Sequence, residues 1–589
     1  MAKTEHFSTS HRGPVVGCTG HPAEPPRRRV GLLLMIPTLT FCVILGGCSL
    51  IGGGDPDLEA DERLEKLLKS PEPPGLIREA AIAHGMRPIR VDGVALVNAL
   101  SGTGGPVNPS VYRDQLLDEM RRESVEDPNL LLERDDTGLV LVSGIIPPGA
   151  RRGDPMDIKV VVPSRSMSSD LHGGWLLDTR MRHQQLIQSA VRRSDVMAIS
   201  IGRVLTKSDY TPSSDDSKRT EGRILAGGRV QIERKLGLLL RPEYKHVKMA
   251  SRIQKAINRR FFFFDGSTRR GIAKAVEDDF IEIEVHPRYR GNEQRMMAVI
   301  RSIAIGKDVA DPQARLTDLA SRLSNPATAR DAALQLESMG EGAVPTLIEG
   351  TKSANPELRF YAAEALAYLD RSEAVAPLEE AAREVLAFRY PSIAALQRID
   401  LQLAVDALQN LMNMPSLETR YGAFCAIRRR SDARLVLHGS EVTNECRLYE
   451  VASSAAPAVV VSLRETAEIV LFGEVSPLQL NGFLRGPDGL IVRADPQNPS
   501  LIRISRFRAG RPDERSGATA TTRGLINGVA AVGGCYGDIV AILRQAKETG
   551  AMVDQFAIDP LPKSLRLYHR EDHADPLDEE AATEGETAI

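Results

Sequence analysis

The middle of the chain follows a helical pattern for more than a hundred residues, and this separates two regions of a different kind. Over residues 311–432 strand patterns disappear and Ala and Leu become frequent. A period of about 30 residues appears, in which Asn325-Pro326 returns as Asn355-Pro356. The sequence therefore predicts an all-α region placed between two others.

The helical units have a recognisable internal order. A helix with small residues ends in a turn, and Val344-Pro345 and Ala376-Pro377 begin a second helix, as proline does at a first helical turn. The pattern resembles HEAT-type α-solenoid repeats. Such units bury their apolar stripe against neighbours, and their concave face usually holds a protein partner. The resemblance implies an unknown protein partner for residues 306–435, and an ordinary helical domain is the alternative.

The flanking regions carry strand patterns, and the clearest lies at residues 139–163. Two β-rich runs are joined there by a Pro-Pro-Gly turn and a basic corner. In the second run Ile158 and Val160 share one face while Asp157 and Lys159 point the other way, as in a half-buried strand. We expect a hairpin with no chemistry of its own.

Strand and helix patterns continue through the regions on both sides of the helical one. They predict an α+β fold, in which mixed β-rich domains are interrupted by an all-α HEAT-like solenoid. The four phenylalanines at 261–264 favour a strand buried on both faces over a ligand site. Residues 508–522 are expected to be mobile. We expect strands at 91–105, 171–177, 196–205, 236–240, 280–285, 459–461, 469–472, 490–494 and 501–504, helices at 112–123, 249–261, 293–305, 525–531 and 536–549, and a small hairpin at 223–233.

The amino terminus indicates export. Arg27, Arg28 and Arg29 precede an apolar run that ends in Leu-Gly-Gly-Cys48, followed by Ser49. This resembles a bacterial lipoprotein signal, which implies cleavage before Cys48 and lipidation of that residue. Residues 1–47 are then the signal peptide and 48–75 a polar tether. An uncleaved signal anchor is the alternative, since the apolar run approaches the length of a membrane span.

The cysteines suggest no metal or redox motif. Of the six, four remain in the expected mature chain: Cys48, Cys425, Cys446 and Cys535. An exported compartment permits a disulfide among the last three, but the sequence does not choose the pair. The CxxC spacing of zinc and redox sites does not occur.

The composition disfavours nucleic acid as a partner. Lys and Arg total 75 against 78 Asp and Glu, so the chain creates no strong global field. Aromatic residues make up 4% of the chain, and Trp175 is the only tryptophan, so platforms for base stacking are scarce.

No catalytic pattern is complete. The glycines at 101–105 lack the Gly-Lys-Ser/Thr of a phosphate loop, and neither HExxH nor GxSxG occurs. His172, His183, His246 and His286 lack the short spacings of a metal site. We therefore expect no catalytic residue, cofactor site or metal site, and an enzyme is disfavoured.

Several blocks in a shared order resemble the flagellar basal-body P-ring protein family. They are VALVNALSGTGG at 94–105, the hairpin at 139–163, HGGWLL at 172–177, residues 222–233, and two carboxy-terminal blocks that contain AVVVSLRETAEIVLFGEV and LINGVAAVGGCYGDIVAILRQ. Together they extend over 87–305 and 456–560. The resemblance implies a non-enzymatic periplasmic subunit that forms a homo-oligomeric ring around the flagellar rod, next to the L-ring, as a bushing associated with peptidoglycan.

Two features depart from that family. A lipidated Cys48 would tether the subunit to a membrane, and Ser49 is compatible with the outer membrane. The helical region 306–435 separates P-ring-like regions at 76–305 and 436–569, and an acidic tail expected to be disordered follows at 570–589. Insertion is tolerable if the ends of the insert lie close together. The alternative function is an envelope lipoprotein adaptor whose helical repeats bind a protein partner.

Overall fold

The computed structural model describes residues 71–570 except 165, 188–189, 212–215, 310 and 433–435. These residues belong to one compact unit. Cys48, the signal, most of the tether and the acidic tail lie outside the described residues. None of the helices in the described ranges is long and apolar enough to cross a membrane.

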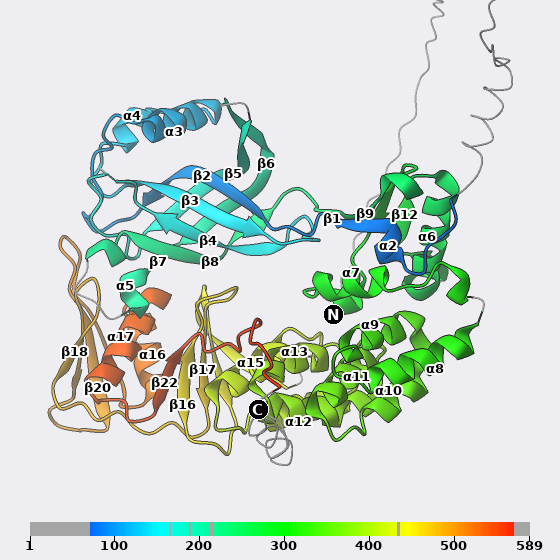
Figure 1. Cartoon of the computed structure of the whole chain (residues 1–589). Coiled ribbons are helices and arrows are strands. Elements are labelled where there is room, and N and C mark those ends of the chain that lie inside the picture. Colours follow the sequence, from blue (N-terminus) through cyan, green and yellow to red (C-terminus); the bar gives the residue numbers. More distant parts are fainter. Residues whose placement is uncertain are drawn as a thin grey trace, which may run out of the picture. The chain divides into compact units, whose positions relative to one another are not determined.

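Seven strands form an antiparallel sheet in the order β4-β3-β2-β5-β6-β8-β7, and β8 also pairs with β4, so the sheet closes on itself (Figure 1). Gly144 and Gly228 both face Met156, where any Cβ would collide with that side chain. The interior is apolar and includes Val91, Val142 and Met181. The strands are β2 (Ile89–Asn98), β3 (Gly138–Ile146), β4 (Pro155–Val161), β5 (Trp175–Ile187), β6 (Ala190–Arg203), β7 (Leu205–Thr206) and β8 (Glu221–Val230).

The expected hairpin at 139–163 is confirmed as β3 and β4, with Ile158 and Val160 fully buried. The helix expected at 112–123 is α3 (Val111–Arg122), which with α4 (Pro128–Leu131) packs against the outside of the sheet. The hairpin expected at 223–233 is wrong. Residues 221–230 form the single strand β8, because Ala226, with a φ of 48°, bends the chain without reversing it.

A smaller α/β layer contains a sheet of order β1-β9-β13-β12 covered by helices. The strands and helices expected at 236–240, 249–261, 280–285 and 293–305 are present with small shifts of boundary. The elements are α2 (Ile77–Ala80), β1 (Ala81–His84), β9 (Leu236–Leu240), α6 (Val247–Arg260), β12 (Ala273–Ala275), β13 (Phe280–Ile283) and α7 (Glu293–Arg301).

The prediction of a fully buried phenylalanine strand is wrong. Phe261 is 0% exposed, but Phe264 is 68% exposed. The chain turns at Gly266, where φ is +61°, and β10 (Phe262–Asp265) pairs only with β11 (Thr268–Gly271). The guanidinium of Arg269 lies 3.7 Å from the ring centroid of Phe262. Cation–π contacts thus partly cover the aromatic rings instead of a second layer.

Helices alone occupy the described residues between 312 and 428, as expected for this region. Pro312, Pro345 and Pro356 lie in the first turns of their helices, where the missing N–H costs no intrahelical bond. Consecutive helices pack against one another through alanine-rich faces. They are α8 (Pro312–Leu323), α9 (Ala329–Met339), α10 (Val344–Gly350), α11 (Pro356–Tyr368), α12 (Val375–Glu384), α13 (Leu386–Leu396), α14 (Gln402–Leu411) and α15 (Leu417–Arg428).

The carboxy-terminal region returns to α+β. Its two sheets have the orders β14-β15-β17-β16-β22 and β18-β19-β20-β21, and α16 and α17 share an apolar core with both (Figure 1). The elements are β14 (Gly439–Thr443), β15 (Cys446–Val451), β16 (Ala458–Val461), β17 (Glu468–Phe472), β18 (Phe483–Arg485), β19 (Leu490–Ala494), β20 (Leu501–Arg506), β21 (Glu514–Thr519), α16 (Thr522–Ala531), α17 (Tyr536–Glu548) and β22 (Gln555–Ile558).

The expectation that 508–522 is mobile is wrong for β21. This strand pairs with β20 from Leu501↔Thr519 to Arg506↔Glu514. The guanidinium of Arg508 binds both carboxylate oxygens of Glu514, at 2.8 and 2.9 Å, and this closes the hairpin.

Candidate functional site

The closed sheet meets the carboxy-terminal region at a buried histidine. The Nδ1 of His172 lies 2.8 Å from Oδ1 of Asp209, and its Nε2 lies 3.0 Å from Oδ1 of Asp538. The three side chains are 9%, 2% and 1% exposed, respectively. We call this set the His172 junction, because its members come from the sheet region and from α17 of the carboxy-terminal region.

Helix capping explains why two carboxylates point at one imidazole. Asp209 is the third residue of α5 (Lys207–Tyr210), and its Oδ2 accepts from the backbone N–H of Thr206 at 2.9 Å. Asp538 is the third residue of α17, and its Oδ2 accepts from the N–H of Cys535 at 2.8 Å. Each carboxylate therefore caps its own helix with one oxygen and meets His172 with the other.

The two helices can approach because Gly537 has no side chain. A Cβ at that position would lie 2.8 Å from Oδ2 of Asp209 and 3.4 Å from Cε1 of His172. Larger residues at position 537 would push α17 away from α5. The Nε of Arg544, further along α17, donates to the carbonyl of Asp209 at 3.2 Å.

Arg506 extends the network into the carboxy-terminal core. Its Nη1 lies 3.2 Å from Oδ2 of Asp538, and its Nη2 lies 2.7 Å from Oδ2 of Asp488. Asp538 thus lies between two cationic side chains, one from each region.

The electrostatics favour a charged imidazole. Burial opposes the charge, but the Coulombic attraction of Asp209 and the hydrogen bonds to both carboxylates outweigh it, so the pKa of His172 is raised well above 6.5. Burial also opposes the charge of Asp538, but His172 and Arg506 hold the pKa of that carboxyl below its usual range. Burial and the charge of Asp538 raise the pKa of the Cys535 thiol to about 12.

His172, Cys535 and Asp538 also lie close enough together to be considered as metal ligands. The donor set fits an ion-pair network better. Both imidazole nitrogens already meet carboxylate oxygens, the thiol of Cys535 is held protonated, and the guanidinium of Arg506 occupies the second oxygen of Asp538. A metal ligand set requires a thiolate and a neutral imidazole. We assign the cluster no metal.

Backbone contacts reinforce the junction beside it. Asp157 on β4 accepts from the N–H of Ala226 at 2.7 Å and from the N–H of Glu465 at 3.0 Å. Arg223 on β8 donates to the carbonyl of Leu463 at 2.8 Å. Since Asp157 and Arg223 belong to the closed sheet, the loop before β17 is fixed to it at two points.

A second buried cluster joins the small α/β layer to the helical region. The Tyr289 hydroxyl donates to Oε1 of Glu337 at 2.5 Å, and Nη2 of Arg295 lies 2.6 Å from Oε2 of Glu337. The Nη1 of Arg295 lies 2.5 Å from Glu364, and Tyr289 stacks on Tyr368 with ring centroids 4.8 Å apart. We call this the Glu337 junction.

Charge at the Glu337 junction is fully paired. Glu337 is 0% exposed, and its burial raises the pKa of the carboxyl against the opposing effect of Arg295. Burial also works against the charge of Arg295, but Glu337 and Glu364 raise the pKa of the guanidinium further.

A third cluster joins α15 to the sheet that contains β17. The Tyr421 hydroxyl donates to Oε1 of Glu468 at 3.2 Å, and Nε of Arg428 lies 3.0 Å from its Oε2. Burial raises the pKa of Glu468 to about 7, while Arg428 works in the opposite direction. Arg420 is fully buried and donates to the carbonyl of Ala456 at 2.8 Å. The helical region is therefore anchored at both of its ends.

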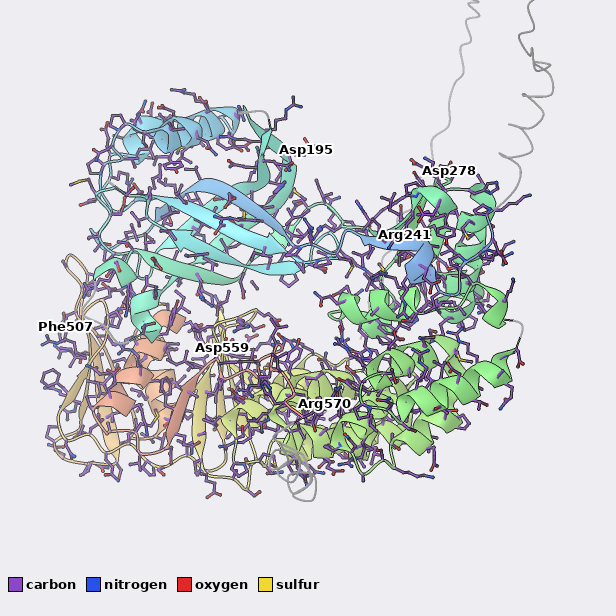
Figure 2. The ribbon with its side chains drawn as sticks, in the orientation of Figure 1. Asp195, Arg241, Asp278, Phe507, Asp559 and Arg570 are labelled. Atoms are coloured by element: carbon purple, nitrogen blue, oxygen red, sulfur yellow. The ribbon has the colours of Figure 1, made fainter. Side chains whose placement is uncertain are left out.

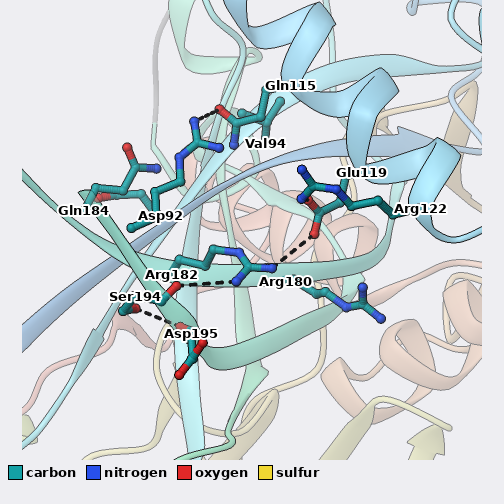
Figure 3. A pocket seen from close by; sticks show the side chains of 11 residues that line it. Asp92, Val94, Gln115, Glu119, Arg122, Arg180, Arg182, Gln184, Ser194 and Asp195 are labelled. Carbon is teal, nitrogen blue, oxygen red and sulfur yellow. Dashed lines mark hydrogen bonds and ion pairs between the residues drawn. The ribbon is translucent and has the colours of Figure 1, made fainter. Parts of the chain in front are cut away.

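A polar cleft of about 320 Å³ lies between α3 and the outer ends of β5 and β6 (Figure 3). The Nη2 of Arg193 donates to Gln115 at 2.9 Å, and Arg182 lies 3.7 Å from Glu119. Its lining includes Ser194 and three carboxylates but no Cys, His or Lys, and two of the carboxylates are ion-paired, Glu119 with Arg182 and Asp92 with Arg90. The residues that line it are Asp92, Val94, Gln115, Glu119, Arg122, Arg180, Arg182, Gln184, Arg193, Ser194 and Asp195.

The structure brings together two of the residues named from the sequence, His172 and Cys535, and leaves the others apart. Cys425 on α15, Cys446 on β15 and Cys535 before α17 are all free thiols, so the disulfide that the compartment would permit is not formed among them. His183, His246 and His286 do not join His172. The junction was missed because its three members lie far apart in the sequence. The only local signals were Asp209 and Asp538, each three residues after a capping position.

A family model and the similar curated proteins identify the same family. Residues 76–316 match the model of the flagellar P-ring protein family. The flagellar P-ring protein of Thermotoga maritima is 28% identical over 244 residues, which cover 40% of this chain and 67% of the relative. The protein of that name from Bradyrhizobium sp. is 26% identical over 246 residues, 40% of this chain and 61% of the relative.

The corresponding Escherichia fergusonii protein is 25% identical over 280 residues, which cover 45% of this chain and 70% of the relative. The resemblance to the P-ring family is confirmed for residues 76–316, which hold the closed sheet, the small α/β layer and the start of α8. The family is structural and not enzymatic. The resemblance of residues 456–560 lies outside the matched range and remains a prediction.

Proposed function

From the P-ring sequence of residues 76–316, we propose that this chain is a structural subunit of a flagellar P-ring-like assembly in the periplasm. The observation that carries the proposal is the family match, which ends at residue 316, the fifth residue of α8. The closed sheet of the family region has a core of its own, whereas the small α/β layer shares its core with the helical region, which begins where the match ends.

The proposed subunit forms a homo-oligomeric ring around the flagellar rod. Head-to-tail contacts close into a ring only if the rotation between neighbours closes, so subunits must present a fixed shape. The three buried junctions support this requirement, since each ties two parts of the chain together by charged groups that are costly to separate. Contacts with the rod, the L-ring and peptidoglycan would be made by this ring, which serves as a bushing.

Cys48 is proposed to carry a lipid that anchors the subunit to the envelope, with Ser49 directing it to the outer membrane. The lipoprotein signal in the sequence supports this part of the proposal. Replacement of Cys48 by Ser should release the protein into the soluble periplasmic fraction. If that variant stays in the membrane fraction, an uncleaved anchor accounts better for the amino terminus.

The helical region is proposed to be a HEAT-like arm that contacts a protein partner, and this also supports a second candidate function, an envelope lipoprotein adaptor. The specific observation in its favour is that helices α9 to α15 lie outside the matched family range. Deletion of residues 311–432 separates the two functions. Ring assembly and motility that survive the deletion place the ring function in the flanking regions, and loss of partner binding alone favours the adaptor.

The proposed function is tested by electron microscopy of basal bodies isolated from a strain that lacks the gene. We expect basal bodies without a P-ring and cells that do not swim. An intact P-ring in that strain would refute the proposal. Restoration by the wild-type gene, but not by a variant without residues 76–305, controls for effects on neighbouring genes.

A further inference from the structure

One face of α6 carries a row of cations. Lys248, Arg252, Lys255 and Arg259 are spaced four, three and four residues apart, which places them along one side of the helix. They line a groove of about 610 Å³ whose other wall includes Ile305 and residues next to it. Among the described residues that line this groove, none is acidic.

The groove continues toward the start of α8. A cavity of about 520 Å³ shares Arg259 with it and adds Arg260, Arg288 and Arg315. The buried Nη2 of Arg260 has no hydrogen-bond partner among the described residues. The carboxylate that lines this cavity, Glu341, already binds Arg371. We call the groove and the cavity together the basic groove.

Two cations of the row have no carboxylate partner among the described residues. Arg288 binds Asp370 at 3.0 Å, but neither Lys255 nor Arg259 forms an ion pair with any described residue. Neighbouring like charges on one helix face are unfavourable. A concave surface lined by one sign of charge also concentrates counter-ions. The basic groove is therefore suited to a polyanion.

The chain contains such a polyanion immediately after its last described residue. Residues 571–589 include eight Asp or Glu and neither Lys nor Arg. Arg570 binds Glu357 at 2.7 Å and donates to the carbonyl of Pro326 at 2.8 Å, so this segment starts beside the end of α8 (Figure 2 labels Arg570).

The distance is within reach. The helix α8 has 12 residues and is about 18 Å long, and Pro312 at its other end lines the basic groove. An extended chain spans about 3.3–3.6 Å per residue, so about six residues span the length of α8 and ten residues reach about 33–36 Å. The run Asp578, Glu579 and Glu580 lies eight to ten residues after Arg570.

We propose that the acidic segment 571–589 binds in the basic groove of the same chain. Attachment at Arg570 gives it an effective concentration of about a millimolar, which an anionic ligand in solution must exceed to displace it. The segment then acts as an internal competitor that covers α6 in the free subunit. This inference does not depend on the proposed ring function.

Zero-length coupling of carboxylates to lysine amines in the full-length protein tests the proposal. Lys248 and Lys255 report the groove, and Lys352 is the matched control. It is exposed and lies five residues before Glu357, closer to the start of the acidic segment. We expect peptides that join residues 571–589 to Lys248 or Lys255 to exceed those that join it to Lys352 by about fivefold. The excess should disappear at 0.5 M salt, where charges are screened within a few ångströms.

Two further arms complete the experiment. The Arg252→Ser, Arg259→Ser double variant keeps both lysines and should lose the excess. In an equal mixture of ¹⁴N and ¹⁵N chains, the joined peptides should carry a single label. Equal yields at Lys255 and Lys352 would overturn the proposal, and so would mixed labels, which would place the acidic segment in a second copy. Binding of anionic vesicles that is unchanged when 571–589 are deleted would show a groove open to lipid, and would also overturn it.

Discussion

The His172 and Glu337 junctions place buried carboxylates against a cation from another part of the chain, but they use different cations. At the Glu337 junction the cation is Arg295, which keeps its charge at any physiological pH. At the His172 junction the cation is the imidazolium of His172, which can lose its proton as the pH rises. The Glu337 junction therefore contains a cation whose charge does not change with pH, and the His172 junction contains one that loses its charge under alkaline conditions.

The two junctions also differ in how the carboxylates are used. Glu337 has no helix-capping role, and both of its oxygens serve the junction. Asp209 and Asp538 each give one oxygen to a helix cap and one to His172. After loss of the cation, Asp209 and Asp538 would keep the hydrogen bonds to their helix caps. Glu337 would keep fewer partners while it stays buried, so loss of its cation should cost more free energy of unfolding.

The largest effect is expected from Arg295→Ala, because it leaves Glu337 and Glu364 buried without a cation. Removal of one partner of a buried pair costs about 3–5 kcal/mol in the free energy of unfolding. Urea unfolding followed by helical circular dichroism measures it. The control is Arg383→Ala, which breaks only the half-exposed pair with Glu379 and should cost at most about 1 kcal/mol. Equal losses in the two variants would contradict the assignment of the Glu337 junction.

A smaller loss is expected from His172→Ala, about 2 kcal/mol, because Arg506 and the capping N–H groups still satisfy Asp538 in part. Trp175 is the only tryptophan and lies three residues from His172, so its fluorescence reports this junction directly. His183→Ala is the matched control, since His183 contacts a backbone carbonyl on the sheet surface. If His172→Ala and the control unfold at the same urea concentration, the His172 junction does not stabilise the fold.

The pH dependence should distinguish the junctions further. The folded pKa of His172 lies above its ordinary value of 6.5, so the folded state holds a proton that the unfolded state has lost. The stabilisation is complete below pH 6.5 and is lost as pH rises through the raised pKa, by at most about 1.4 kcal/mol per pH unit. Unfolding of the wild type and His172→Gln from pH 7 to 9 measures the difference.

Other titrating groups also contribute to the pH dependence of unfolding. Glu468, whose folded pKa is about 7, changes the free energy of unfolding mainly below pH 7. The groups that face His172 are Asp170, Asp209 and Asp538, with Cys535 and Arg506 beside them. The buried thiols of Cys425, Cys446 and Cys535, each with a pKa raised to about 12, add the same slope near pH 9 to both proteins, so the difference between the proteins reports His172. Equal slopes in the two proteins from pH 7 to 8 would contradict the comparison between the junctions.

The smallest effect is expected from Cys535→Ser, within about 0.5 kcal/mol. The Cys535 sulfur accepts from the N–H of residue 538 in the capping box, and a serine hydroxyl makes the same bond. An ion-pair network does not need the thiolate, whereas a metal site would. Unfolding with and without a chelator gives the readout, and a chelator-dependent loss in the wild type would replace the ion-pair assignment by a metal centre.

Much of the fold was predictable because it rests on local patterns. The β3–β4 hairpin and α6 follow from periodicity, and α8 to α15 from their alanine-rich helical pattern and early prolines. The wrong predictions concern segments whose structure depends on tertiary contacts rather than on local sequence. Phe264 has the pattern of a buried strand but lies on a hairpin with no covering layer, and β21 is ordered by pairing with β20 rather than by its own Gly- and Thr-rich sequence.

The candidate site was not predictable in the same way. His172, Asp209 and Asp538 are separated by 37 and 329 residues, and they meet only when α17 packs against α5. Thr206 and Asp209 have the spacing of a capping box, but Cys535 is not a usual N-cap residue, and a capping carboxylate normally faces solvent. Only the tertiary contact at Gly537 turns two ordinary caps into one buried network.

The central claim, that this chain is a ring subunit with the helical region as an added arm, is tested most directly by cryo-electron tomography of flagellar motors. Averaged motors from the wild type are compared with those from a strain in which residues 311–432 are deleted. We expect that P-ring density remains and that a peripheral density of about 120 residues per subunit disappears. Motors that are identical in the two strains would contradict it.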